Sequence, residues 1–283
     1  MNKIAVLTDS AVNLPKQFMD LDFVYVAPLK VNRDGEEFLD GIDIDPRTVA
    51  SEIDDHDFKT TLVNPLEALS FYNKAKDDGY NILLSVNLSS SLSGTFNSFR
   101  IAADQIEGVE VYNFDTNSAG IGAGLQVIRA IELVQANKSI SEIIEYLEGH
   151  KKNSKVTLLP GSLKYLVKGG RLSKLKGTIG GILNISPILE VQESGEIIQV
   201  AKGRGFKNAI TTSIKRYSEM FKNLGTIDVG LSTSFDEEEL DIAEAALKEA
   251  LPKIRNVYRT YLTPVLCIHA GPKNIVISIY PID

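Results

Sequence analysis

Hydroxyl side chains gather in one short segment of the chain, Asn87-Leu88-Ser89-Ser90-Ser91-Leu92-Ser93-Gly94-Thr95. The apolar run Ile82 to Val86 before it predicts a strand, and the pattern after it predicts a helix that begins near Thr95. The free N–H groups and dipole at a helix N-terminus attract anions, and Gly94 would let the backbone approach a ligand. N-capping by Ser93 or Thr95 explains one hydroxyl but not all of them. The segment therefore predicts an anion-binding turn.

His269 and two arginines are the other side chains suited to an anion. The apolar run Val265 to Ile268 predicts a strand, and Gly271-Pro272 predicts a turn, so the His269 ring would project from a strand end. The alternative interpretation is that His269 is a structural residue whose ring is hydrogen-bonded within the fold. Arg171 in Lys168-Gly169-Gly170-Arg171 and Arg204 in Lys202-Gly203-Arg204-Gly205 each place a guanidinium beside a flexible turn, as an anion ligand or as a plain surface charge.

Common cofactor and catalytic signatures do not fit the sequence. After Gly122 and Gly124 a dinucleotide fingerprint needs a third glycine at position 127, which is Val127, so close helix packing by small residues is the expected role. We expect no cofactor and no metal, because His and Cys do not occur at ligand spacing. The nucleophile elbow is also absent around Ser93. A serine-type acyl hydrolase using Ser93 and His269 remains the alternative function, since triads are recognised by geometry.

Composition and charge narrow the class of protein. The chain has 283 residues, with 30 basic and 37 acidic side chains and a net charge of −7, which argues against a nucleic-acid partner. The single cysteine, Cys267, lies in an apolar run that predicts a strand, which excludes a disulfide framework and favours a reducing, cytoplasmic setting. No run of about eighteen apolar residues occurs, so we expect a soluble protein with no integral membrane segment and at most transient membrane contact.

One basic stretch stands out in this acidic chain. The segment from Lys164 to Lys176 contains five basic residues and no acidic one: Lys164, Lys168, Arg171, Lys174 and Lys176. It is either a solvated loop and helix face or a surface that meets something anionic.

The first half of the chain alternates apolar runs with amphipathic patterns. Strands are expected at Ile4 to Thr8, Phe23 to Val26, Ile82 to Val86 and Val109 to Phe114, and helices at Pro65 to Lys76, Thr95 to Ile106, Gly124 to Gln135 and Ser141 to Lys151. Ser139 and Glu142 form a candidate capping box for the last helix. This βαβ rhythm predicts a mainly parallel sheet flanked by helices.

The second half predicts a mixed sheet with helices. Strands are expected at Ile197 to Val200 and Ile227 to Ser232, and helices near Lys207 to Leu224 and at Glu237 to Leu251. Three strand-like runs then follow, close enough to pair: Asn256 to Tyr261, Pro264 to His269 and Asn274 to Tyr280. We therefore predict two α/β subdomains, residues 1–155 and 156–283.

Six segments, in order, resemble the DegV family of bacterial fatty-acid-binding proteins, which includes the acid-binding subunits of fatty acid kinase. The resemblance runs over about residues 3–282 as one unit. The segments are Thr8-Asp9-Ser10, Lys59-Thr60-Thr61, Ser89 to Thr95, Leu163 to Arg171, Leu183-Asn184-Ile185-Ser186-Pro187-Ile188-Leu189 and His269-Ala270-Gly271-Pro272.

The resemblance implies a long-chain fatty acid, for example palmitate or oleate, in a buried tunnel between or beside the subdomains. The carboxylate would be held by Thr61, Ser93 and His269, with Thr60, Gly94, Thr95 and Arg171 in support. In the family, a separate ATP-dependent fatty acid kinase subunit converts the acid to an acyl phosphate, and Arg171 matches an arginine tied to that transfer. The chain itself would then be a substrate-presenting protein rather than an enzyme, and we infer that the basic stretch suits docking of the partner.

The sequence departs from the family pattern at three places. Leu62-Val63 stands where Gln-Pro is usual, Ser186 stands where Lys is usual, and Lys273 stands where Gly commonly follows Gly-Pro. These changes bear on kinase coupling and chain preference more than on acid binding. A regulatory interaction module that uses the fold without a ligand is a third class of function, which would have an empty or polar-filled cavity.

Overall fold

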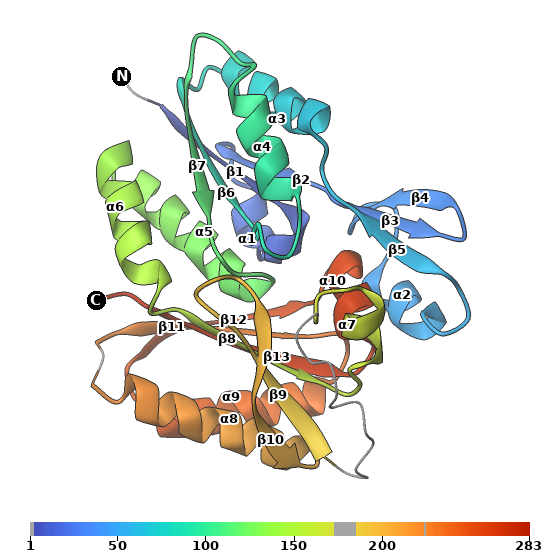
Figure 1. The fold of residues 1–283 in the computed structure, drawn as a ribbon. Helices are drawn as coiled ribbons and strands as arrows, with labels where there is room; N and C mark the ends of the chain where they lie inside the picture. Colours follow the sequence, from blue (N-terminus) through green and yellow to red (C-terminus); the bar gives the residue numbers. More distant parts are fainter. Residues whose placement is uncertain (1–2, 173–184, 224) are drawn as a thin grey trace.

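The N-terminal half contains a four-stranded parallel sheet in the computed structural model, which describes residues 3–172, 185–223 and 225–283 (Figure 1). Its strand order is β2-β1-β6-β7, with β1 Ile4–Asp9, β2 Val24–Ala27, β6 Ile82–Asn87 and β7 Glu110–Asp115. Residues along β1 and β6 are almost all buried, as expected for a parallel sheet covered on both faces.

Helices cover both faces of this sheet. Besides a 3-10 turn, Ser10–Val12, they are α1 Lys16–Met19, α3 Pro65–Asp77, α4 Thr95–Ala103, α5 Ile121–Gln135 and α6 Ile140–Lys151. Side chains alternate between two buried clusters, so that Leu7 packs with Tyr72 and Phe99 while Val6 packs with Ile128. The capping box at Ser139 and Glu142 is confirmed.

A small antiparallel sheet, which the sequence analysis did not predict, projects from this half. Its order is β4-β3-β5, with β3 Lys30–Arg33, β4 Glu36–Leu39 and β5 Phe58–Thr61, and α2 Pro46–Glu52 lies between β4 and β5 in the chain. Because β5 ends at Thr61, this sheet positions Thr60 and Thr61.

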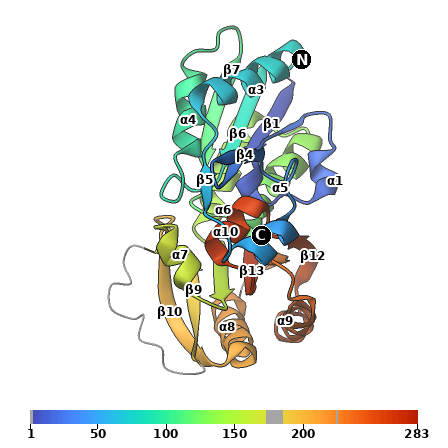
Figure 2. The ribbon, with the colours of Figure 1, turned by 90° about the vertical axis from the view of Figure 1, so that its right-hand side faces the viewer.

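The C-terminal half contains a six-stranded mixed sheet in the order β10-β9-β8-β13-β11-β12. The strands are β8 Lys155–Pro160, β9 Ile185–Val191, β10 Ile197–Arg204, β11 Ile227–Thr233, β12 Ile254–Tyr261 and β13 Asn274–Pro281, and the helices are α7 Lys164–Lys168, α8 Phe206–Phe221, α9 Glu237–Ala250 and α10 Pro264–Ala270. Helices α8 and α9 cover the face of this sheet that lies away from the N-terminal half (Figures 1 and 2). The predicted α/β class, with a parallel and a mixed sheet, is confirmed.

The prediction of a strand from Pro264 to His269 is wrong, because this segment forms α10. Pro264 has the fixed φ that suits the first helical position, and Asp40 Oδ1 accepts a hydrogen bond from the Val265 backbone N–H at 2.9 Å. Cys267 is therefore buried in a helix rather than in a strand. Strands β12 and β13 both pair with β11 instead of with each other.

Close packing by the glycines of α5 is confirmed. A Cβ atom added at Gly122 would lie 2.1 Å from Val156 Cγ2, and one at Gly124 would lie 2.6 Å from the Val12 carbonyl oxygen. Helix α5 can therefore pack directly against β8 of the other half.

The division into subdomains 1–155 and 156–283 stays a proposal. Strand β8 begins at Lys155, but one buried cluster includes Leu7, Val156 and Val276, which belong to both halves. Leu183, Asn184 and Leu224 lie outside the described residues, as do Lys174 and Lys176 of the basic stretch. Among the described helices, none has both the length and the apolarity to cross a bilayer.

Candidate functional site

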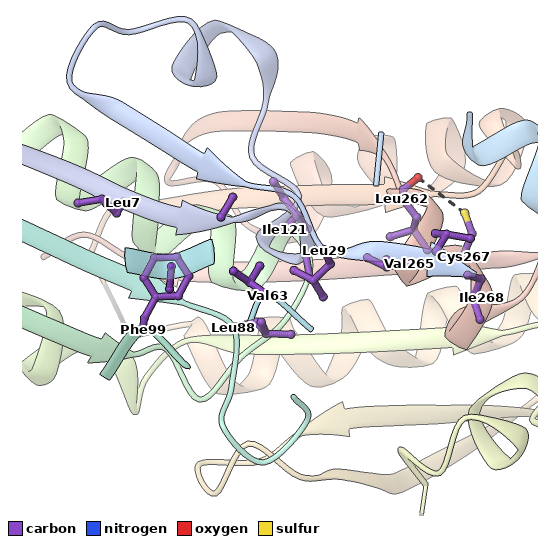
Figure 3. Close-up of a cluster of buried hydrophobic side chains, with 14 of the residues drawn as sticks. Leu7, Leu29, Val63, Leu88, Phe99, Ile121, Leu262, Val265, Cys267 and Ile268 are labelled. Carbon is purple, nitrogen blue, oxygen red and sulfur yellow. Dashed lines mark hydrogen bonds between the residues drawn. The ribbon is translucent and has the colours of Figure 1, made fainter. Parts of the chain in front are cut away.

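An apolar cavity lies where the two halves meet, beside α10 and the loops that follow β6 and β7. The volume of the cavity is about 200 Å³. Its walls are mostly aliphatic, including Leu29, Leu88, Leu158, Val156, Val191, Leu262, Val265 and Val276. Figure 3 shows Leu29, Leu88, Leu262 and Val265 in the buried cluster that backs this wall.

Five polar side chains line the cavity within the described part of the chain, and all five are residues that the sequence analysis selected. They are Thr60, Thr61, Ser93, Arg171 and His269. They come from β5, the turn before α4, the segment after α7, and α10. The structure thus brings the predicted residues to one cavity, although the roles predicted for them remain untested.

His269 contacts Thr60 rather than Thr61. The His269 Nε2 and Thr60 Oγ1 atoms lie 3.0 Å apart, while Nδ1 is buried with no hydrogen-bond partner among the described residues. Burial, together with the positive charge of Arg171, lowers the pKa of His269 to about 4. The ring is therefore neutral near pH 7, with one N–H to donate.

The ring of His269 fits closely against a glycine. A Cβ atom added at Gly169 would lie 2.2 Å from His269 Nδ1, so any larger residue would displace the ring. Gly169, which belongs to the Leu163 to Arg171 segment, therefore leaves the space that the His269 ring occupies.

Ser93 lies at the start of α4, as predicted. Its Oγ is 3.0 Å from Thr95 Oγ1 and accepts a hydrogen bond from the Thr95 backbone N–H at 3.3 Å. Thr95 is fully buried and does not line the cavity, so it contacts Ser93 from the side of the protein interior. A Cβ atom added at Gly94 would lie 2.8 Å from Leu62 Cδ2, so the departure at Leu62 packs an apolar side chain onto this turn.

Arg171 joins two segments of the site. Its Nε donates to the Leu92 carbonyl at 3.2 Å and its Nη1 donates to the Gly169 carbonyl. The side chain is half-buried, and burial lowers the pKa of Arg171, although a guanidinium stays charged in proteins. Arg171 therefore supplies a positive charge next to a neutral histidine in an apolar cavity.

Two buried aspartates position these loops, and neither was predicted to have a role in the site. Asp9 Oδ2 accepts from the Leu88 N–H at 3.0 Å and from Asn87 Nδ2 at 3.1 Å, and it thereby fixes the loop that leads to Ser93. Asp40 holds the first turn of α10. The available signal for Asp9 was an acidic residue at the carboxyl end of a buried parallel strand, where sites collect in such folds.

The catalytic arrangement of the alternative hydrolase is not assembled in this structure. Ser93 Oγ bonds to Thr95 and His269 Nε2 bonds to Thr60, so the two do not form a hydrogen-bonded pair. The Arg171 cation lowers the pKa of His269. A triad instead needs a hydrogen-bond acceptor that orients the imidazole.

Aspartates that lie elsewhere in the sequence partly neutralise the basic stretch. Lys164 Nζ is 2.6 Å from Asp54 Oδ1, and Lys168 Nζ is 3.3 Å from Asp57 Oδ1. All four side chains are more than half exposed, so these ion pairs contribute little to stability.

The family model and the relatives that match this chain all belong to one family. A family model described as an uncharacterised protein of the DegV family matches residues 3–281. A DegV domain-containing protein of Clostridium acetobutylicum is 30% identical over 276 residues, and one of Staphylococcus aureus is 32% identical over 272 residues, each match covering 96% of both chains.

Solved structures are also similar to this chain, including one from Thermus thermophilus and one from Bacillus subtilis. A DegV family protein from Thermus thermophilus, described by its fatty acid binding, is 26% identical with a TM-score of 0.93 and covers 99% of this chain and 100% of its own. DegV from Bacillus subtilis, described as a fatty acid binding protein, is 26% identical with a TM-score of 0.89 and full coverage of both chains, 100% each.

Proposed function

Because this chain belongs to the DegV family, we propose that it binds a long-chain fatty acid, such as palmitate or oleate, in the apolar cavity. The observation that carries the proposal is the make-up of the cavity, with an aliphatic wall and a polar cluster of Thr60, Thr61, Ser93, Arg171 and His269. The acyl chain matches the aliphatic wall and the carboxylate matches the cluster. The fatty acid binding described for the similar proteins from Thermus thermophilus and Bacillus subtilis supports this assignment.

The two ends of the ligand have different energetic roles. Burial of an acyl chain of about fourteen methylenes supplies on the order of 10 kcal/mol of gross transfer free energy, at about 0.8 kcal/mol per CH₂. Each hydrogen bond to a charged carboxylate adds about 1.5–3 kcal/mol. The tail therefore sets affinity, whereas the polar cluster fixes orientation and prevents an unpaired buried charge.

We infer that Thr61, Ser93 and His269 contact the carboxylate, with Thr60, Gly94 and Thr95 in support. A neutral His269 donates one N–H, the two hydroxyls donate their O–H groups, and Arg171 supplies the opposite charge. A bound carboxylate would in turn stabilise the protonated form of His269 and raise its pKa.

We further propose that the carboxylate is presented to a separate ATP-dependent kinase subunit for acyl-phosphate formation. Thr61 and Leu62 are exposed as well as lining the cavity, so the head group lies near the protein surface. A partner can therefore reach the carboxylate while the tail stays buried, and an acidic surface of that partner would compete with Asp54 and Asp57 for the exposed Lys164 and Lys168 of α7.

The direct test is organic extraction of the purified protein followed by mass spectrometry. A stoichiometric long-chain acid, or a rise in melting temperature on adding palmitate or oleate, is the expected result. Repeated preparations with no acid and no thermal shift would rule out the proposal.

Substitutions in this polar cluster of Thr60, Thr61, Ser93, Arg171 and His269, called the head-group cluster below, give the first prediction. Ser93→Ala should weaken binding by roughly 10- to 150-fold, because it removes one hydrogen bond to the charged carboxylate, worth about 1.5–3 kcal/mol, while the tail contacts remain. Thr61→Val and His269→Gln should act in the same direction in a fluorescent fatty acid displacement assay. The matched control is Ser90→Ala, an exposed serine of the same loop that does not line the cavity. An equal effect of Ser90→Ala and Ser93→Ala would contradict the assignment.

A further inference from the structure

A second cavity lies behind one wall of the apolar cavity. Its volume is about 240 Å³. Its lining is largely polar and includes Thr116, Asn117, Ser118 and Lys151. The two cavities have two lining residues in common, Val156 and Val191. These two valines therefore separate an apolar space from a polar one.

The two valines form a cross-strand pair. They lie directly opposite each other in the antiparallel register of β8 and β9. Opposite side chains in such a ladder stand on the same face, with Cβ atoms about 4.5–5.5 Å apart, and branching at Cβ limits their rotamers. The pair is thus a continuous and stiff part of the wall.

Both ends of this wall are held in place. The Cγ2 atom of Val156 lies so close to α5 that only a glycine fits at position 122. Beyond Val191, the turn between β9 and β10 is tied to the N-terminal half, since Ser91 Oγ donates to the Ser194 carbonyl at 2.6 Å and Asn117 Nδ2 donates to the Glu193 carbonyl at 2.8 Å. The wall therefore cannot move aside easily.

The pair lies at the end of β8 opposite to the one that leads to the head-group cluster. Pro160, at the end of β8 that leads to α7 and Arg171, pairs with Asn274, which closely follows α10 and His269. Val156 lies four residues back along β8, a distance of roughly 13 Å at about 3.3 Å per residue. A ligand with its carboxylate in the cluster would therefore direct its methyl end toward the valines.

The polar cavity is an unfavourable place for a methyl group. Ser118 is 3% exposed, and its Oγ has no hydrogen-bond partner among the described residues. A methylene that entered this space would displace water from such groups without replacing its hydrogen bonds.

We propose that the Val156 and Val191 pair is the end stop for the acyl chain and sets the longest fatty acid that the protein accepts. The inference rests on the proposed function, and it assigns a specificity role to two residues outside the head-group cluster. Acids that end short of the pair fill the cavity progressively, whereas longer ones must bend or leave their head group out of place.

A series of saturated acids from laurate to arachidate tests this proposal in displacement assays on the full chain. Wild type should gain about fourfold in affinity per methylene, the ratio that about 0.8 kcal/mol per CH₂ gives, and then stop gaining at one length. Val156→Ala and Val191→Ala should move that limit to longer acids, because the removed methyl groups lengthen the apolar cavity before the polar one is reached. Val191→Phe should move the limit to shorter acids, because the larger side chain fills space instead of leaving a cavity.

Val276→Ala is the matched control, because Val276 lines the same cavity on β13 but does not border the polar one. It should lower affinity for all acids without moving the limit. Identical limits in wild type and the pair variants, or an equal shift in Val276→Ala, would overturn the end stop while leaving fatty acid binding intact. Failure of wild type to bind any acid would instead overturn the proposed function.

Discussion

His269 is a neutral side chain held in an environment that opposes its protonation. Its pKa is about 4 in the folded protein, chiefly because of burial, against about 6.5 in an unfolded chain. The unfolded state therefore binds a proton more readily between these values. Stability that is present above pH 6.5 should be lost as the pH falls toward 4, by about 3 kcal/mol in the limit.

Two buried carboxyls titrate in the same range with the opposite sign. Burial raises the pKa of Asp9 to about 7 and that of Asp40 to about 6, so their contribution to stability is present at low pH and lost as the pH rises through those values. The pH dependence of wild type alone is thus a sum of opposing effects, and only a comparison with a variant isolates His269.

We predict that His269→Gln makes the unfolding free energy of the ligand-free protein less sensitive to acid between pH 6.5 and 4 than that of wild type. Urea melts across this range measure the difference. Adding palmitate to wild type should also reduce the sensitivity, because a nearby carboxylate favours protonated His269. Parallel pH profiles for wild type and variant would show that His269 does not titrate as the structure implies.

At the scale of elements, the long periodic segments of the chain were predictable and the short ones that carry the site were not. Strands β1, β6 and β7 and helices α3 to α6 have clear periodicity, and each matches its prediction within a few residues. Strand β5 contains Phe58-Lys59-Thr60-Thr61, too short and polar to stand out. The apolar run of α10 has no distinctive period, and contacts from a distant loop, through Asp40, favour its helical form.

Asp40 should therefore affect both stability and ligand binding. We predict that Asp40→Ala lowers the unfolding free energy by about 0.5–2 kcal/mol, the usual loss for a side chain that caps a helix. It should also weaken fatty acid binding, because α10 carries His269 and Val265 into the cavity. Urea melts and displacement assays measure the two effects. Asp43→Ala is the control, since Asp43 accepts from the Leu39 N–H at an exposed site; similar binding losses in both variants would contradict a role through α10.

At the scale of the whole molecule, the two halves share contacts that no local pattern reveals. Arg255 of β12 bonds to Asp228 of β11 and, at 2.8 Å, to Glu132 of α5. Tyr146 of α6 donates to the Ile282 carbonyl at 2.6 Å. Periodicity predicts each half, but partners more than a hundred residues apart are set by packing, so the cavity between the halves could be inferred only through the resemblance.

These shared contacts predict that the halves unfold together. Gly122→Ala should lower the unfolding free energy by about 1–3 kcal/mol, because the new Cβ would lie 2.1 Å from Val156 Cγ2 and force α5 away from β8. Gly149→Ala in α6 is the control, since its Cβ would have no neighbour within 4 Å and alanine favours the helix. Far- and near-ultraviolet circular dichroism in urea should give one coincident transition, shifted down by Gly122→Ala and not by Gly149→Ala. Two separate transitions, with only one shifted by Gly122→Ala, would show that the halves fold independently.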